Sequence, residues 1–347
     1  MPVGSIIGIA LCREARVVCA VLLTLAIGWP SLAGCQAREP RNEAVVSEAR
    51  PASPLAVVLA TDCGVEMDDQ WALAHLLLSR ELALRAVITT HASSIGFSSA
   101  TSAKKAAEVI ARVPPAAGSP PPPVVTGSDS PLREATAPRE SPGVDTLLEL
   151  SRSHSASRRL VILATGAATD IASAILKDPS IVDRVSVVAM GFDDWPRGGD
   201  GFNVKNDPLA WRILLNSDVP VVVGSGAVTR RGLRLTRAEA AALMRPHGAV
   251  GEYLYSLFDD WLRKQATIVA LYVAPETWVV WDEVVVAYAL GMARGNEVPR
   301  PQLQADLSFS HPETSRRMTW LTEIDTDRVW LDLTKKMDAR GQAERQP

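Results

Sequence analysis

The chain has 347 residues, of which 47% are hydrophobic and 22% are charged, and its net charge at pH 7 is −3. This composition is ordinary for a globular protein with a sizeable core, and the length allows one large α/β domain or two small ones. Because there is no dominant basic field, the charge gives no reason to expect nucleic acid as a partner.

The first 35 residues have the pattern of an export signal. Arg13 and Arg16 precede an apolar run at residues 17–27, which is shorter than the ~20 residues needed to span a bilayer. The run is followed by Leu-Ala-Gly-Cys at residues 32–35, which resembles a bacterial lipobox. We therefore predict a lipid on Cys35 and anchoring to the bacterial cell envelope, on its periplasmic or outer surface. An uncleaved anchor and an ordinary secretory signal are the alternatives.

A tether follows the predicted signal. Residues 36–54 are polar, lack periodicity and contain proline, so we expect them to be flexible. Cysteine usage agrees with export, because Cys12 and Cys19 leave with the signal and Cys35 carries the lipid. Only Cys63 then remains, and the mature chain has no internal disulfide to form.

Strands and helices alternate from residue 55 onward, and we predict the catalytic domain over residues 55–335. Short apolar runs predict strands at residues 56–60, 84–89, 124–125, 160–164, 185–190 and 219–223. Helices are expected at residues 71–78, 99–112 and 170–176 and from Pro208. The Pro-rich segment 114–123 is short enough to be a surface loop.

The pattern turns mainly helical after residue 235. Helices are predicted at residues 237–244, 253–270 and 283–289, and residues 336–347 are expected to form a disordered tail. Strands that recur between helices indicate an α/β fold, with a mostly parallel, Rossmann-like open sheet covered by helices on both faces. Ligands bind such sheets beyond the carboxyl ends of the strands, so the residues there are candidates for a site.

The first predicted strand ends in a loop crowded with acids. Asp62, Glu66, Asp68 and Asp69 lie within eight residues, between a buried strand and a helix. Crowded carboxylates raise one another's pKa unless a positive charge lies among them. Oxygen ligands suit a hard cation such as calcium or magnesium better than zinc. Helix capping is the alternative, and it explains one or two of these acids rather than four.

Three later segments also place polar groups at the ends of elements. Thr165 and Gly166 follow the strand at 160–164, where the glycine permits a sharp turn and the threonine carbonyl can point inward. Asn203 follows a Gly-rich loop, ahead of the helix that begins at Pro208. Asp282 precedes an apolar helix and, taken alone, reads as an N-cap.

Taken together and in this order, the four segments resemble the inosine-uridine preferring nucleoside hydrolase family. That family opens with an Asp-rich loop, has a Thr-Gly turn in mid-chain and an Asn element followed by Asp-Pro, and carries a late Asp before an Ala-rich helix. The resemblance covers nearly the whole chain after residue 53. The longer opening loop, Thr-Asp-x-x-x-x-x-Asp-Asp with Glu66 inside it, is similar to a divergent branch of the superfamily.

The resemblance implies a calcium site and its ligands. Asp62 would bind calcium and act as the base for the attacking water. Asp69 would be the bidentate calcium ligand, Thr165 would offer its carbonyl oxygen, and Asp282 would complete the shell. Whether Glu66, in a two-residue insertion, joins this shell is left open.

The resemblance also implies sugar contacts, and here the chain departs from the family. Asp68 would hydrogen-bond the ribose hydroxyls and Asn203 would hold the sugar. The Glu expected before Phe202 is Gly201, with Asp200 as the candidate substitute. The late His is Trp281, which we assign to an aromatic wall against the substrate. Ala60 and Ser94 stand where the family has Asp and Asn.

The function implied by the resemblance is calcium-dependent hydrolysis of the N-glycosidic bond of ribonucleosides, by a homo-oligomer. A glycosidase of another sugar and a non-catalytic calcium-dependent sugar- or nucleoside-binding lipoprotein are the alternatives. His91 and His247 are candidate proton donors to the leaving base, although a histidine in a loop is more often solvated. Trp195, Trp278 and Trp281 could line a pocket or belong to the core.

Overall fold

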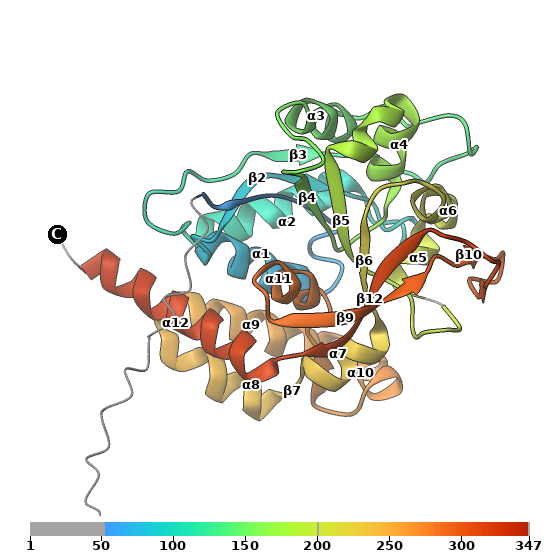
Figure 1. Ribbon diagram of the computed structural model, residues 1–347. Helices are drawn as coiled ribbons and strands as arrows, with labels where there is room; N and C mark the ends of the chain where they lie inside the picture. The colour runs from blue at the N-terminus through green and yellow to red at the C-terminus, as the bar shows by residue number, and fades with distance from the viewer. Residues whose placement is uncertain (1–52, 200, 346–347) are drawn as a thin grey trace, which may run out of the picture. The chain divides into compact units, whose positions relative to one another are not determined.

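The computed structural model describes residues 53–199 and 201–345. The predicted signal, Cys35, nearly all of the tether and Asp200 lie outside these residues. The described chain is built on an eight-stranded sheet with the order β3-β2-β1-β4-β5-β6-β12-β9 (Figure 1). Its strands are β1 (Leu55–Thr61), β2 (Leu82–Thr89), β3 (Val124–Thr126), β4 (Leu160–Ala164), β5 (Val185–Met190), β6 (Val221–Gly224), β9 (Ala293–Pro299) and β12 (Arg317–Ile324).

The predicted parallel sheet is confirmed. Every pair of neighbouring strands runs parallel except β12 and β9, which are antiparallel. The run in β1 is apolar without alternation because both faces of the strand are covered. Val57 and Leu59 pack into the core on one face, while Val58 and Ala60 pack into the core on the other. This is the two-residue period of a buried strand.

Helices cover both faces of the sheet (Figure 1). One core receives side chains from α1 (Asp68–Leu78), α2 (Ser99–Arg112), α8 (Arg237–Met244), α9 (Gly248–Lys264), α11 (Glu283–Ala289) and α12 (Thr326–Arg345). The opposite core receives them from α3 (Pro142–Ser151), α4 (Thr169–Lys177) and α6 (Pro208–Asn216). Among the described residues, no helix has the length and apolar character needed to cross a membrane.

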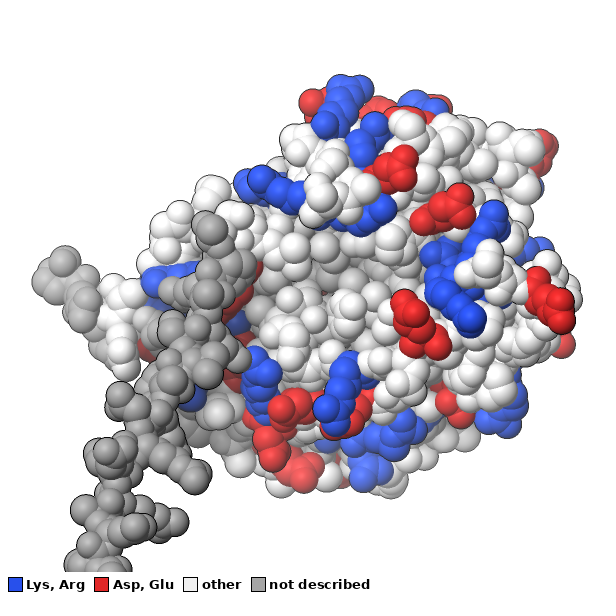
Figure 2. All heavy atoms as spheres, viewed as in Figure 1, with Lys and Arg blue, Asp and Glu red and all other residues white. Residues whose placement is uncertain are grey.

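Shorter elements complete the domain. The helices α5 (Phe202–Asn206), α7 (Gly226–Gly232) and α10 (Ala266–Tyr272) lie in the connections. Two small antiparallel pairs join β7 (Arg234–Thr236) to β8 (Thr277–Val279) and β10 (Gln302–Leu303) to β11 (Phe309–Ser310). On the face seen in Figure 2, acidic and basic side chains are interspersed around a mostly uncharged centre, so this face carries no single-sign field.

The chain after residue 235 differs from the prediction in three ways. It is mainly helical, as predicted, but it also supplies β12 and β9 to the main sheet, which the sequence pattern did not indicate. The helix expected at 253–270 is two helices, α9 and α10, interrupted at Gln265. The predicted disorder of the tail is wrong for residues 336–345, because α12 continues to Arg345. Met337 is 2% exposed, so this part of the helix packs against the core and is ordered by that contact.

Candidate active site

The acidic loop lies at the carboxyl edge of the sheet, as its position after β1 predicts. Asp62 follows β1, and Asp68 and Asp69 form the first turn of α1. All three are buried, with at most 3% of their surface exposed. The chain turns at Gly64, whose φ of 94° is a left-handed conformation that favours glycine. The N-cap of α1 is Met67 and makes no side-chain cap bond, so capping does not account for the buried aspartates.

Residues from two other elements complete this cluster. Thr165, at the end of β4, donates its hydroxyl to Asp69 Oδ1 at 3.0 Å, and Thr61 donates to the same oxygen. Asp282, at the start of α11, lies with its main-chain N–H 3.4 Å from Asp68 Oδ2. Its side chain makes no N-cap bond, although capping was the simplest interpretation of Asp282 alone. The loop after β1 and the start of α11 thus meet across the site.

The donor set fits a divalent cation. One carboxylate oxygen from each of Asp68, Asp69 and Asp282 lies within 4.8 Å of the others. Asp62 Oδ2 is buried and has no hydrogen-bond partner. A buried, unpaired carboxylate oxygen is costly unless a cation or donor satisfies it. Oxygen donors of this kind are those that calcium and magnesium prefer.

Burial and mutual repulsion raise the pKa values of the carboxylates in the cluster. Burial raises the pKa of Asp62 well above its usual value, and repulsion from Asp69, Asp68 and Glu66 raises it further. Burial also raises the pKa of Asp282, followed by repulsion from Asp68, Asp69 and Asp62. Burial raises the pKa of Asp69 to about 6, against the lowering effect of hydrogen bonds from Thr61 and Thr165. A bound cation would reverse these shifts.

The cluster forms the floor of a cavity of about 470 Å³. Asn203 lines one wall and is oriented by a 3.3 Å hydrogen bond from its Nδ2 to the carbonyl oxygen of Met190. The structure therefore brings seven of the eight predicted substrate and metal residues into one cavity: Asp62, Asp68, Asp69, Thr165, Asn203, Trp281 and Asp282. Asp200, the remaining candidate, lies outside the described residues.

An aromatic wall of three tryptophans also lines the cavity. Trp261, Trp278 and Trp281 line the cavity. Trp278 packs against both of the others, with ring centroids 5.4 Å from Trp261 and 6.2 Å from Trp281. Arg230 lies over the Trp281 ring, 5.3 Å from its centroid. Tyr272 of α10 lines the same cavity and is 67% exposed. The wall is therefore aromatic, with rings inclined at 54° and 87° to their neighbours, and a single ring face can stack on a flat ligand ring.

Other candidates lie away from this cavity. His91 is fully buried, with Nε2 2.9 Å from the hydroxyl of Thr169, so its interpretation as a solvated residue is wrong. His247 pairs with Asp338 on α12. Neither histidine is among the residues that line the cavity. Trp195 packs against Phe309 and Trp320, which agrees with the core interpretation.

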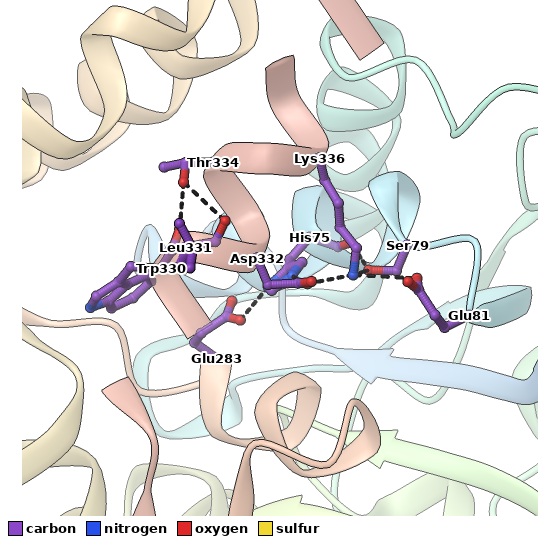
Figure 3. A network of polar contacts seen from close by, with 9 residues as sticks. All are labelled: His75, Ser79, Glu81, Glu283, Trp330, Leu331, Asp332, Thr334 and Lys336. Atoms are coloured by element: carbon purple, nitrogen blue, oxygen red, sulfur yellow. Dashed lines mark hydrogen bonds and ion pairs between the residues drawn. The ribbon is translucent and has the colours of Figure 1, made fainter. Parts of the chain in front are cut away.

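A buried polar network that the sequence did not suggest holds two of the site's helices together (Figure 3). His75 of α1 lies with Nδ1 2.5 Å from Glu283 Oε1 and Nε2 2.9 Å from Asp332 Oδ2. Lys336 contacts Asp332 and donates to Ser79 Oγ at 2.9 Å. The network joins α1, α11 and α12. Since α1 begins with Asp68 and Asp69 and α11 follows Asp282, it sets the spacing of the two halves of the cluster.

Burial lowers the pKa of His75, but the charge of Glu283 and the hydrogen bonds to Asp332 and Glu283 outweigh burial, so the net pKa is raised. The two carboxylates thus favour the protonated form of His75, which lies between them. Its helix is buried along its whole length, so periodicity alone gave His75 no distinguishing signal.

Comparison with known proteins agrees with this geometry. The structure is similar to a plant nucleoside hydrolase (TM-score 0.66, 18% identity, covering 82% of this chain and 99% of the other). It is also similar to the purine-preferring ribonucleoside hydrolase from Gardnerella vaginalis (0.65, 20%, 83% and 99%) and to the inosine-uridine preferring nucleoside hydrolase from Bacillus anthracis (0.62, 16%, 82% and 100%). These likenesses show a shared fold. A comparison with curated protein sequences gives no match.

The family comparison covers nearly all of the described chain. The model of the inosine-uridine preferring nucleoside hydrolases matches residues 57–343, which include the acidic loop, Thr165, Asn203 and Asp282. The chain therefore belongs to the inosine-uridine preferring nucleoside hydrolase family and is an N-glycosyl hydrolase.

Proposed function

We propose that the protein is a calcium-dependent hydrolase that cleaves the N-glycosidic bond of ribonucleosides to release the free base and ribose. The observation that carries this proposal is the buried carboxylate cluster on the cavity floor, with Asp62 Oδ2 unpaired beside it. Asp62, Asp69, Asp282 and the Thr165 carbonyl would hold the metal. When bound, a divalent cation would neutralise the cluster and polarise the oxygens held against it.

The chain's own residues supply the remaining chemistry. Asp62 would accept the proton of the attacking water, because its carboxylate has an oxygen with no other partner. Asp68 and Asn203, which line the same cavity, would hold the sugar hydroxyls. The carboxylates would stabilise the positive charge that develops on the sugar ring in an oxocarbenium-like transition state. Holding water and sugar together removes much of the entropic barrier.

The leaving base would rest on the aromatic wall. The indole N–H of Trp281 can donate a hydrogen bond but is not acidic enough to protonate a leaving nitrogen, and neither His91 nor His247 lines the cavity. Stacking on Trp281 and its neighbours would then orient the base and exclude water. The Gardnerella relative is named as purine-preferring, and a wall of three tryptophans suits a bicyclic purine.

A glycosidase of another sugar is the second candidate. It is supported by Glu66, which lines the cavity inside the loop that holds Asp62 and Asp68. The third reading, a non-catalytic binding lipoprotein, is disfavoured by Asp62, since binding alone needs no base at the floor.

The test uses purified protein without the predicted signal, residues 36–347. Calcium content is measured, and release of reducing sugar from inosine, guanosine and uridine is assayed with and without chelator. Asp62→Asn should lose nearly all turnover while retaining nucleoside affinity, and Glu108→Gln, on the exposed side of α2, should match the wild type. Equal turnover in wild type and Asp62→Asn would remove Asp62 as the base. Calcium binding without turnover of any riboside would favour the second or third candidate.

We further propose that the chain is exported, lipidated on Cys35 and anchored to the cell envelope, and that it self-associates as the family resemblance implies. The support for the anchor is the sequence pattern alone. Radiolabelled fatty acid should be incorporated into the full-length chain and not into Cys35→Ala. Light scattering of the signal-free protein measures its oligomeric state, and a monomer would contradict self-association.

A further inference from the structure

Glu66 lies in the acidic loop but outside the cluster that fits the metal. The three carboxylates whose oxygens converge belong to Asp68, Asp69 and Asp282. Glu66 lines the cavity instead and is only partly buried. Its Oε2 accepts a 3.0 Å hydrogen bond from the indole N–H of Trp278. The carboxylate is therefore held at the boundary between the floor and the aromatic wall.

The partner of Glu66 is itself rigidly placed. Trp278 is 3% exposed and belongs to β8, which pairs with β7. Its ring packs between Trp261 and Trp281, the latter in an edge-on contact at 87°. Because the tryptophan cannot move without disturbing these contacts, the hydrogen bond orients the carboxylate as well as satisfying the indole. A carboxylate has two acceptor oxygens, and the indole engages one of them.

A purely structural role would be an unfavourable use of an acid here. Glu66 lies two residues from Asp68 in the acidic loop and lines the same cavity as Asp62, Asp68 and Asp69. A neutral acceptor would satisfy the indole without adding another negative charge to this loop. Acids kept at such a cost in a cavity wall are typical of sites that bind a ligand. The chemistry open to Glu66 is acceptance of a hydrogen bond from a group in the cavity.

We propose that Glu66, oriented by Trp278, is a specificity-determining residue that accepts a hydrogen bond from a hydroxyl or N–H of the substrate, beyond the atoms held by the carboxylate cluster. This inference rests on the proposed nucleoside hydrolase function. It predicts that the substrate carries a hydroxyl or N–H group where the sugar-binding part of the cavity meets the base-binding part. It also separates Glu66 from the metal ligands.

The first experiment compares Glu66→Ala and Glu66→Gln with the wild type in kcat/KM for inosine and in calcium affinity. Loss of a hydrogen bond to a charged group reduces kcat/KM by roughly 10- to 100-fold, and we expect that loss for Glu66→Ala. Glu66→Gln keeps an acceptor and the bond to Trp278, so it should lose less. Calcium affinity should stay within about twofold in both. Glu108→Gln, an acid far from the cavity, is the matched control.

Two further arms locate the donor. Trp278→Phe keeps the ring and removes the N–H, so it should reproduce part of the Glu66→Ala loss. Inosine is then compared with 2′-deoxyinosine and 5′-deoxyinosine, which lack sugar donors, and with 1-methylinosine, which lacks the base N–H. For one of these analogues, Glu66→Ala and the wild type should have equal kcat/KM. The group missing from that analogue is the one that Glu66 binds.

The outcomes are distinguishable. Wild-type kcat/KM in Glu66→Ala, or loss of calcium binding comparable to that of Asp69→Asn, would overturn the proposal. If the wild type hydrolyses no nucleoside, the proposed function fails, and inosine and ribose binding is then titrated on the same variants in calcium. Weaker binding by Glu66→Ala would still support the inference, and equal or absent binding would overturn it.

Discussion

Replacing His75 with leucine should destabilise the protein by about 3–5 kcal/mol, the range for a buried ion pair that loses one partner. His75 and Glu283 are both fully buried, and their Nδ1 and Oε1 atoms are 2.5 Å apart. Glu283 Oε2 already has no hydrogen-bond partner. Without His75, neither oxygen of Glu283 would be paired. Leucine is close to histidine in volume, so the cost comes from the orphaned charge rather than from a cavity.

The double variant His75→Leu with Glu283→Leu isolates that cause. It removes the orphaned carboxylate together with its partner, while Asp332 keeps its contact with Lys336 and remains partly exposed. We therefore expect the double variant to be more stable than His75→Leu alone. His247→Leu is the matched control, because His247 pairs with Asp338 at the surface, and such pairs contribute about 0–1 kcal/mol.

Urea unfolding followed by circular dichroism measures these differences as changes in midpoint at constant slope. If the free energy of unfolding of His75→Leu lies within about 1 kcal/mol of the wild-type value, the loss is no larger than that of an exposed ion pair. That result would refute the assignment of a buried ion pair. Strict additivity in the double variant would show that His75 and Glu283 act independently.

Three other predictions follow from the same contacts. The pKa values of Asp62, Asp68, Asp282 and His75 are raised, those of Asp69 and Glu66 to about 6 and about 7, so the contribution of these groups to the stability of the metal-free protein falls as pH rises through that range. Without calcium, Tm should therefore fall between about pH 5 and 8, and calcium should raise Tm more at pH 8; a metal-free Tm that rises with pH over this range would contradict the cluster. Deleting residues 336–347 removes Lys336 and the buried Met337, so the truncated protein should unfold at a lower urea concentration. An unchanged urea midpoint would show that these residues do not contribute to stability. The substitution Gly64→Ala puts a side chain on a residue with φ 94° and places its Cβ 2.5 Å from Lys105 Cγ. We expect the free energy of unfolding to fall by about 1–3 kcal/mol and calcium binding to weaken. Urea unfolding and calorimetry measure these changes, and wild-type values would contradict strain in the loop.

The sequence allowed the floor of the site to be predicted because local rules apply there. Asp62, Asp68 and Asp69 follow a recognisable buried strand, and the order of strands places the loop at the carboxyl edge of a parallel sheet. Asp282 was harder to place, since one acid before a helix is usually a cap. The structure brings it beside Asp68 through the packing of α11 on α1, a contact that no local pattern contains.

The walls of the cavity could not be predicted in the same way. Trp261 lies on the amphipathic helix α9, and the sequence pattern of such a helix predicts that an aromatic residue packs in the core. Its position in the cavity depends instead on how α9 packs against the rest of the domain. The bond between Trp278 and Glu66 joins residues 212 positions apart. The strand β9 was missed because its segment is largely exposed and polar, as suits an edge strand. Without its partner β12, it has no apolar run to mark it.

The contacts of His75 and Asp282 also determine when the site can exist during synthesis. Asp282 and Asp68 are 214 positions apart, and His75 and Asp332 are 257 apart. A ribosome releases the acidic loop long before it releases β12, which lies between β6 and β9, or the last helix. Until then Asp62, Asp68 and Asp69 lack Asp282, the residue that completes the cluster. Their crowding begins only when the C-terminal elements dock, so metal loading belongs to the final stage of folding, and a nascent chain that stalls before β12 would carry the acidic motif without its ion-binding pocket.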